Sequence, residues 1–281
     1  MQHPTERPQL LAIDLDGTLV EPLHPVRPAV LAAVARAVEA GVRVTIVTGR
    51  MYVGAAPLVA ALGVDGPIVC YQGAVIADAR SGRFERELSL ANAVALRIYA
   101  AAKEHGYHVQ FYTGDRFFVE ERNQYADLYA RISGTEPVVV SSLPETFAGR
   151  DSTKVNIVTD AARTPECEAL MRRVCGDEAY VTRSNPEFVE MLNPHVDKGR
   201  ALGIVAGQHG IPLARVMAIG DSYNDLPLLR AAGFAVAMGS APPELKAEAD
   251  AVVGDVERDG VAEAIDRFVL DPFDAGKEGA A

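Results

Sequence analysis

The sequence predicts an α/β protein, in which a doubly wound parallel sheet forms the core and a smaller α+β domain is inserted into it. Short apolar runs alternate with helical patterns at both ends of the chain, as expected of a parallel sheet with helices on both faces. The middle of the chain carries strand-like runs and a hairpin signal, which indicates antiparallel pairing. We therefore assign residues 1–80 and 191–281 to the core and residues 81–190 to the inserted domain.

The core segments alternate strands with helices. The first segment has strands at 10–13, 42–47 and 67–71, separated by helices at 28–40 and 52–62. The second has a helix from Lys198, a strand at 216–219, a helix at 224–232, a strand at 234–237 and a last helix at 261–269. Because continuous apolar runs are typical of strands covered on both faces, these strands are expected to form one buried sheet.

The inserted domain combines short strands with two helices. Strand-like runs lie at 83–87, 108–112, 117–119, 155–159 and 180–182, and apolar residues at helical spacing mark 91–105 and 164–175. Aromatic-rich runs on both sides of Gly114-Asp115 give the clearest hairpin signal. These patterns predict an α+β unit with antiparallel strands.

Composition excludes several classes of partner. The chain has 281 residues, 49% of them hydrophobic, and a formal net charge of -11. This charge argues against a nucleic-acid or anionic-membrane partner, since both attract a cationic surface. No apolar stretch reaches the length of a membrane span, and the three cysteines lack the spacing of a zinc site. We expect a cytoplasmic protein that is a monomer or a small homo-oligomer.

Two acids end the first apolar strand. Asp14 and Asp16 follow the run 10–13 directly, in Asp14-Leu15-Asp16-Gly17-Thr18. Two carboxylates at the end of a buried strand can share a divalent cation, while one attacks an electrophile and the other moves a proton. A solvated Asp-Gly turn is the alternative, but it does not account for Asp14 beside the apolar run.

Two further motifs offer groups for a phosphate. Thr48-Gly49-Arg50 lies between an apolar strand and a helix, where a hydroxyl and backbone N–H groups can donate to a phosphate oxygen. Lys198 stands at a helix start, and its ammonium can neutralise phosphate charge. Taken alone, the first can be an ordinary turn and the second a surface lysine.

The fourth motif repeats the pattern of the first. Gly220-Asp221-Ser222-Tyr223-Asn224-Asp225 follows the apolar run 216–219 directly. Its acids repel one another unless a cation or a helix N-terminus offsets their charge, although Asp and Asn also cap helices. Because ligands bind at the carboxyl ends of parallel strands, where the strand order reverses, we expect all four motifs to converge there.

Together these residue types suit phosphoryl transfer, which needs an in-line nucleophile, charge cancellation and an acid for the leaving group. Asp14 is the candidate nucleophile and Asp16 the candidate acid, while Thr48 and Lys198 hold the phosphate oxygens. Oxygen ligands from Asp14, Asp221 and the backbone carbonyl of Asp16 would suit Mg²⁺.

In order and spacing, the four motifs resemble those of the haloacid dehalogenase-like phosphohydrolases, in particular the Cof-type group (subclass IIB), whose cap domain is inserted between the second and third motifs. The runs Tyr71-Gln72-Gly73-Ala74 and Val189-Glu190-Met191 support the same placement. Gln72 departs from the Asn that the group usually has. The resemblance implies a Rossmann-like core and a cap at residues 81–190.

The resemblance also implies roles for the motif residues. Asp14 would form an aspartyl-phosphate, and Asp16 would act as general acid and then as general base. Phosphate or substrate binding falls to Thr48, Gly49, Arg50, Lys198 and Asn224, metal binding to Asp14, Asp16 and Asp221, and support to Ser222 and Asp225. For the cap, Arg122, Tyr112, His108 and Glu190 are candidates for substrate contact.

The function expected is a Mg²⁺-dependent phosphatase that hydrolyses phosphomonoesters of small metabolites, with sugar phosphates first. A phosphomutase of the phosphomannomutase type is an alternative, as is a phosphatase dedicated to sucrose phosphate or mannosyl-phosphoglycerate. A non-catalytic sensor of phosphorylated ligands is the alternative outside enzymes. The presence of both Asp14 and Asp16 argues against the sensor, since binding alone needs no proton shuttle.

Overall fold

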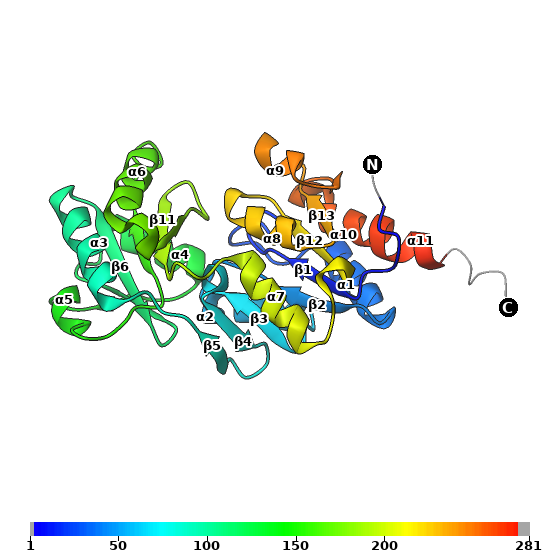
Figure 1. The fold of residues 1–281 in the computed structure, drawn as a ribbon, viewed down its shortest axis with the longest axis horizontal. Helices are drawn as coiled ribbons and strands as arrows, with labels where there is room; N and C mark the ends of the chain where they lie inside the picture. Colours follow the sequence, from blue (N-terminus) through cyan, green and yellow to red (C-terminus); the bar gives the residue numbers. More distant parts are fainter. Residues whose placement is uncertain (1–2, 275–281) are drawn as a thin grey trace.

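The structure is a computed structural model that describes residues 3–274; residues 1–2 and 275–281 of the predicted core segments lie outside the described residues. Figure 1 shows two bodies: a core built from the first and last parts of the chain, and the inserted domain at the left of the view. The strand pairings confirm the predicted fold class, a parallel core sheet with an α+β insertion.

The core contains a parallel sheet of five strands in the order β14-β13-β12-β1-β2. These strands are β1 (Leu10–Ile13), β2 (Arg43–Ile46), β12 (Val216–Gly220), β13 (Phe234–Ala237) and β14 (Ala251–Val252). β1 pairs with β2 on one side and with β12 on the other. The strand order therefore reverses between β1 and β12, and their carboxyl ends are the expected position of a ligand.

Helices cover both faces of this sheet because the side chains of each strand alternate between two apolar clusters. In β1, Leu11 and Ile13 belong to one cluster, and Leu10 and Ala12 belong to the other. The first cluster includes side chains of α1 (Pro28–Glu39), α2 (Tyr52–Ala61) and α10 (Gly260–Ile265), and the second those of α7 (Lys198–Gln208), α8 (Leu226–Ala231) and α9 (Pro243–Ala247). The predicted core helices are thus confirmed.

Two of these helices differ in detail from the prediction. The helix expected at 224–232 starts with a separate 3₁₀ turn, Tyr223–Asp225, before α8 begins. The helix expected at 261–269 ends as α10 at Ile265 and continues as a π-helical turn, Asp266–Leu270.

A second, antiparallel sheet extends the core beyond β2. It consists of β3 (Pro67–Cys70), β4 (Val75–Asp78) and β5 (Phe84–Glu87), and the pair Val47 and Val69 connects it to the parallel sheet. β4 is not among the predicted strands. The strand expected at 83–87 exists as β5, but it pairs with β4 and not with the inserted domain.

The inserted domain is built on a six-stranded sheet in the order β10-β11-β9-β6-β7-β8, with only β7 and β8 parallel. Its strands are β6 (His108–Thr113), β7 (Arg116–Val119), β8 (Val138–Val139), β9 (Val155–Val158), β10 (Tyr180–Thr182) and β11 (Phe188–Leu192). The helices α3 (Asn92–Glu104) and α6 (Thr164–Cys175) and the short α5 (Leu143–Thr146) share an apolar cluster with this sheet. A further helix, α4 (Gln124–Ser133), contributes to the cluster that reaches into the core.

The strand pairings indicate where the chain passes between the two bodies. β5 pairs with the core strand β4, whereas β11 pairs with β9 and β10 as far as Leu192. We therefore propose residues 88–91 and 193–197 as the connections, in place of boundaries at 80/81 and 190/191. The sequences of β5 and β11 do not show which sheet each strand joins, so the boundaries between the bodies could not be placed from them.

The two bodies pack against each other. One apolar cluster contains Tyr71 of the core together with Phe117 of the inserted domain. The tip of the β6–β7 hairpin also reaches the core, where the carboxylate of Asp115 accepts hydrogen bonds from the backbone N–H groups of Tyr52 and Val53 at 3.0 and 2.7 Å. These two residues begin α2, so a side chain of the inserted domain caps a core helix.

Within residues 3–274, no helix combines the length and the apolar character that crossing a membrane requires. The three cysteines are buried and free.

Candidate active site

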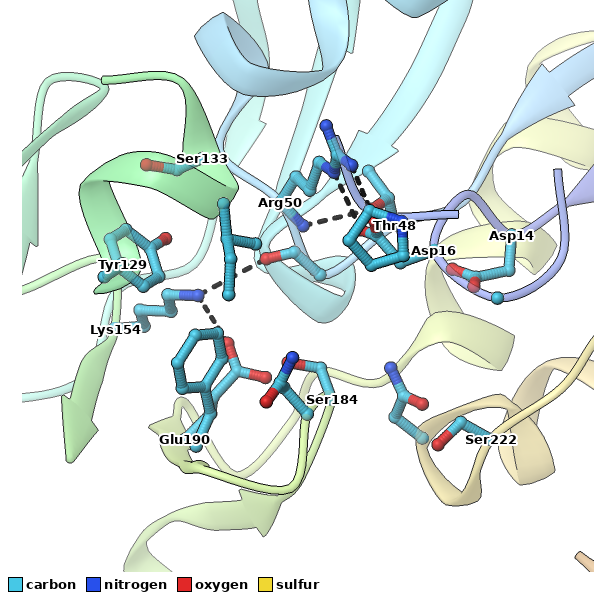
Figure 2. Close-up of a pocket in the computed structure, with 17 residues that line it drawn as sticks. Asp14, Asp16, Thr48, Arg50, Tyr129, Ser133, Lys154, Ser184, Glu190 and Ser222 are labelled. Atoms are coloured by element: carbon cyan, nitrogen blue, oxygen red, sulfur yellow. Dashed lines mark hydrogen bonds and ion pairs between the residues drawn. The ribbon is translucent and has the colours of Figure 1, made fainter. Parts of the chain in front are cut away.

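The four sequence motifs meet at the carboxyl ends of β1 and β12. Asp14 follows β1, Asp221 follows β12, Thr48 lies just beyond β2, and Lys198 begins α7. A cavity of about 170 Å³ opens beside them, between the core and the inserted domain (Figure 2). The predicted residues that line it are Asp14, Asp16, Thr48, Gly49, Arg50, Glu190, Ser222 and Asn224.

Lys198 lies between two carboxylates. Its Nζ donates to Asp14 Oδ1 at 2.6 Å and to Asp225 Oδ1 at 2.5 Å, and all three side chains are buried. Burial opposes the charge of Lys198, but the two carboxylates outweigh it and raise the lysine pKa above its ordinary value. The pKa of Asp14 also lies well above its ordinary value, because burial and the charge of Asp225 outweigh the attraction to Lys198. The acids therefore outnumber the positive charge available to them.

Asp221 adds a third carboxylate to this group. One oxygen each from Asp14, Asp221 and Asp225 lie within 4.8 Å of one another. Burial and the charge of Asp225 raise the pKa of Asp221 to about 7. Both oxygens of Asp225 are hydrogen-bonded, while Asp14 and Asp221 each keep one oxygen that accepts no hydrogen bond from the described residues. The donor set therefore fits a hard divalent cation such as Mg²⁺.

The turn after β1 brings Asp221 close to the first motif. Thr18 Oγ1 donates to Asp221 Oδ1 at 2.7 Å. Gly17 has a φ of +85°, and a Cβ at this position would lie 2.3 Å from Asp221 Oδ2. Glycine is therefore required both by the left-handed backbone and by the close approach of the carboxylate.

The carboxylate of Asp16 is paired with Arg50. Arg50 Nε donates to Asp16 Oδ2 at 2.7 Å and Arg50 Nη2 to Asp16 Oδ1 at 2.5 Å, a bidentate arrangement visible in Figure 2. Arg50 Nη1 also donates to the carbonyl of Gly54 at 3.0 Å. The structure thus joins the candidate acid to the basic residue of the second motif, and the metal contact expected from the Asp16 carbonyl stays a prediction.

The second motif forms a tight turn on the wall of the cavity. Thr48 Oγ1 accepts a hydrogen bond from the backbone N–H of Arg50 at 3.1 Å. A Cβ at Gly49 would lie 2.3 Å from Nε2 of Gln72, so this glycine leaves room for the Gln72 side chain. Gln72 itself is buried with a φ of +57°, a backbone conformation that is uncommon outside glycine.

Asp225 organises the fourth motif. Its Oδ2 accepts hydrogen bonds from the backbone N–H groups of Asp221 and Ser222, both at 3.0 Å, and the Ser222 side chain accepts one from the backbone N–H of Asp225 in return. This reciprocal capping fixes the turn that carries Asp221. Ser222 and Asn224 line the cavity. The geometry agrees with a supporting role for Asp225 and Ser222, which stays a prediction.

The inserted domain supplies the opposite wall, including two buried charges. Lys154 and Glu190 form an ion pair, and each side chain is only 1% exposed. Tyr129, Ser133 and Ser184 lie on the same side of the cavity, as Figure 2 shows. Glu190 is among the residues predicted for substrate contact, whereas Lys154 is not.

One signal would have identified Lys154. It adjoins the apolar strand β9, as Asp14 adjoins β1, and Glu190 interrupts the apolar run Phe188–Leu192 in the same way. A charge inside or beside a buried strand requires a partner or a function. Tyr129 and Ser133 lie on α4, a helix that the sequence analysis does not predict.

Three of the four cap candidates lie elsewhere. Arg122 is paired with Asp127 and Glu136 at an exposed position. Tyr112 is fully buried inside the domain, and His108 lines a separate hollow. Of the four, only Glu190 lines the cavity, so the expectation of substrate contact has no structural support for the other three.

Comparison with known proteins agrees with this geometry. A family model described as haloacid dehalogenase-like hydrolase matches residues 11–265. The pyridoxal phosphate phosphatase of Escherichia coli (strain K12) is 30% identical over 269 residues, covering 92% of this chain and 97% of the relative. The HMP-PP phosphatase of Serratia proteamaculans (strain 568) is 28% identical, covering 94% and 97%.

A solved structure gives the same result for the fold. The crystal structure of a haloacid dehalogenase-like hydrolase from Bacteroides thetaiotaomicron is 29% identical in sequence and has a TM-score of 0.82, covering 93% of this chain and 99% of that one. The family match spans all four motifs and both bodies of the structure. The chain therefore belongs to the haloacid dehalogenase-like hydrolase family.

Proposed function

We propose that the protein is a Mg²⁺-dependent phosphatase that hydrolyses monoesters of small phosphorylated metabolites through a phosphorylated Asp14. The observation that carries this proposal is the position of Asp14, which is held by Lys198, grouped with Asp221 and open to a cavity. Both relatives described above are phosphatases by name. Sugar phosphates stay the first substrate class that we expect, and pyridoxal phosphate joins the panel of test substrates.

The proposed reaction has two displacement steps. An oxygen of Asp14 attacks phosphorus, the bond from phosphorus to the ester oxygen breaks, and Asp16 gives its proton to the departing alkoxide. Water then attacks the acyl phosphate while Asp16 takes up a proton, which returns free Asp14 and inorganic phosphate. A Mg²⁺ ion held by Asp14 and Asp221 would supply positive charge next to the phosphoryl oxygens.

The residues around Asp14 have complementary tasks in this proposal. Lys198 fixes the Asp14 carboxylate and remains cationic, so it offsets the charge of an arriving phosphate. Thr48 and Asn224 offer polar groups on the wall of the cavity. Arg50 donates to both oxygens of Asp16, so this pair must open before Asp16 can carry the proton that it gives to the leaving group, and a phosphate or leaving group that binds Arg50 would open it. The inserted domain covers the cavity and limits the access of water.

Release of phosphate from para-nitrophenyl phosphate tests the proposal. We expect turnover with Mg²⁺. Activity should be at least about 10³-fold lower in Asp14→Asn, because the nucleophile is lost, and after chelation of the metal, because the charge of the phosphoryl group is then not compensated. Asp65→Asn, an equivalent change at an exposed position, serves as the control.

The same assay separates the alternatives. An Asp14→Asn protein that keeps its activity would refute the assignment of Asp14 as the nucleophile. A wild-type protein that binds phosphate without releasing any from the substrate would favour the sensor. A requirement for a hexose bisphosphate, with isomerised product, would favour the mutase.

A further inference from the structure

A chain of buried side chains connects the inserted domain to the phosphate side of the site. Lys154 Nζ donates to the carboxylate of Glu190 and, at 3.3 Å, to the carbonyl of Gly49. Glu190 Oε2 accepts a hydrogen bond from Gln72 Nε2 at 2.7 Å, and Gln72 Oε1 accepts one from Asn224 Nδ2 at 3.0 Å. All four side chains are buried, and Asn224 lines the same cavity as Asp14. Figure 2 shows the Lys154 end of this chain.

The direction of these hydrogen bonds is fixed at one end. A carboxylate only accepts, whereas a side-chain amide donates at its nitrogen and accepts at its oxygen. Because Glu190 accepts, Gln72 must turn its nitrogen to Glu190 and its oxygen to Asn224. Asn224 must then turn its nitrogen to Gln72. A single charge in the inserted domain thus orients two amides of the core.

No competing partner sets the orientation of Asn224. Its Oδ1 is buried and has no hydrogen-bond partner among the described residues. Gln72 is held for this task by its left-handed backbone, with a φ of +57°, and by the space that Gly49 leaves beside its Nε2. Strained backbone of this kind persists where the surrounding structure requires it, and it clusters at functional sites.

Lys154 keeps Glu190, the first acceptor of this hydrogen-bond chain, negatively charged. Its ammonium lies 4.9 Å from the ring centre of Tyr112 and 5.7 Å from those of Tyr71 and Tyr129. Burial opposes the charge, but Glu190 and Tyr129 outweigh it and raise the lysine pKa. With a cation beside it, Glu190 stays an acceptor.

We propose that Glu190 and Gln72 are positioning residues, which orient the Asn224 amide so that its nitrogen serves the phosphoryl group bound at Asp14. This inference rests on the proposed function. Phosphoryl oxygens at neutral pH are acceptors, so only the amide nitrogen of Asn224 can bind them, through the N–H that Gln72 does not use. The inserted domain thereby sets the hydrogen bonding of Asn224, a core residue with which it shares no direct hydrogen bond among the described residues.

Glu190→Gln tests the direction of the chain. The ammonium of Lys154 attracts the oxygen of the introduced amide, so the nitrogen of that amide faces Gln72 and both following amides invert. We expect a fall of about tenfold or more in kcat/KM with para-nitrophenyl phosphate, and a similar loss of affinity for inorganic phosphate by calorimetry with Mg²⁺ present, as for one lost hydrogen bond to a charged group. Glu121→Gln, the same change at an exposed position of the inserted domain, should alter neither.

The double variant Gln72→Glu with Glu190→Gln restores the direction. The introduced amide donates to the introduced carboxylate, and this carboxylate accepts from Asn224, while the net charge near Lys154 is unchanged. We expect most of the lost activity and phosphate affinity to return, whereas Gln72→Glu alone places two carboxylates together and loses both. A purely structural role for Glu190 predicts no such rescue, and a double variant as weak as the singles overturns the proposal.

Two further outcomes keep the tests separate. If Glu190→Gln does not fold, Gln72→Met decides, since it leaves the Lys154–Glu190 pair intact and removes the acceptor that orients the Asn224 nitrogen; full activity and phosphate affinity in Gln72→Met overturn the proposal. If the wild-type protein releases no phosphate, the proposed function fails. Comparing the affinities of the wild type and the variants for inorganic phosphate then still decides whether Glu190 and Gln72 orient Asn224.

Discussion

Charge balance among a few residues defines the site. Asp14, Asp221 and Asp225 lie together around the single ammonium of Lys198, and the pKa values of Asp14 and Asp221 are raised by burial and by the charge of Asp225. A divalent cation would relieve this repulsion and let an anionic phosphate approach Asp14. Metal binding and the protonation of these acids must therefore compete.

The affinity for Mg²⁺ should fall on acidification. The pKa of Asp221 is about 7, so below pH 7 its carboxyl must lose a proton before it can bind the metal, and above pH 7 it is already ionised. For one displaced proton, the Kd for Mg²⁺ should be roughly a hundredfold higher at pH 5 than at pH 8. Calorimetric titration across this range measures the effect. Asp221→Asn should bind weakly with a shallower pH dependence, and a flat profile in the wild type would contradict this account.

Gly17 should be needed for the metal and not only for the turn. A Cβ at Gly17 would lie 2.3 Å from Asp221 Oδ2, whereas Gly41 has nearly the same φ, +84° against +85°, and open space around it. Both Gly→Ala variants should lose about 1 kcal/mol of stability from backbone strain. Only Gly17→Ala should weaken Mg²⁺ binding, by about tenfold or more, since it displaces a ligand. Calorimetry and thermal unfolding of both variants separate the two effects, and equal Mg²⁺ affinities would disprove the steric argument.

Three of the candidate site residues, Asp14, Asp221 and Lys198, share a property that can be read from the sequence. Each is a charge next to an apolar strand or at the start of a helix. Lys154 has the same signature and was not found, because a strand of the inserted domain carries it and no motif accompanies it. The chain from Glu190 through Gln72 to Asn224 could not be predicted, since it joins three distant segments whose relative placement depends on packing.

At the scale of elements, a contact between bodies holds the inserted domain over the cavity. Asp115, at the tip of the β6–β7 hairpin, accepts the first N–H groups of α2 and also a hydrogen bond from the hydroxyl of Tyr71 at 2.9 Å. The residue before this helix provides no side-chain cap of its own. Helix α2 therefore depends on the other body to satisfy its N-terminus.

Asp115→Ala should loosen this contact. Loss of a helix cap costs about 1 kcal/mol, which favours separation of the hairpin from α2 by roughly fivefold. The amides of Tyr52 and Val53 should exchange hydrogen faster, and KM should rise as the domain opens. Ser142→Ala removes a cap inside the inserted domain, at α5, and should change neither quantity. Unchanged exchange at Tyr52 and Val53 in Asp115→Ala would show that the hairpin does not hold the domain.

Most helices and strands could be predicted from the spacing of apolar residues, because an element that buries a face carries apolar residues at its own period. β1, β10, β13 and α6 have the predicted bounds. Some of the missed elements lack such a pattern: β8 and β14 have two residues each, and α4 has mixed polarity. In contrast, β4 and β11 were missed although both are mostly apolar and buried. The partner of β5 was also not predictable, since a short polar strand fits either sheet equally well until its neighbours are placed.

At the scale of the whole molecule, the two bodies share one apolar cluster, so their stabilities should be coupled. The sheet of the inserted domain contributes Tyr112, Phe117 and Val158 to the cluster that also holds Leu11 and Ile13 of β1. Separating the bodies would expose to water the apolar side chains that meet across their contact, such as Tyr71 and Tyr112, at a cost in free energy. Stabilising the core should therefore also stabilise the inserted domain.

Mg²⁺ should reveal this coupling in hydrogen exchange. At a concentration 100 times its Kd, the ion adds about 2.7 kcal/mol to the free energy of unfolding, so amides that exchange only by global unfolding should slow by about a hundredfold. Because the bodies share a cluster, amides of β6 and β9 in the inserted domain should slow as much as those of β1 and β12, although the proposed metal site lies in the core. Asp221→Asn should abolish the effect in both bodies, as it removes a ligand without touching the shared cluster. Slowing confined to β1 and β12 would mean that the inserted domain unfolds independently, and the apolar contact between the bodies would then contribute little to stability.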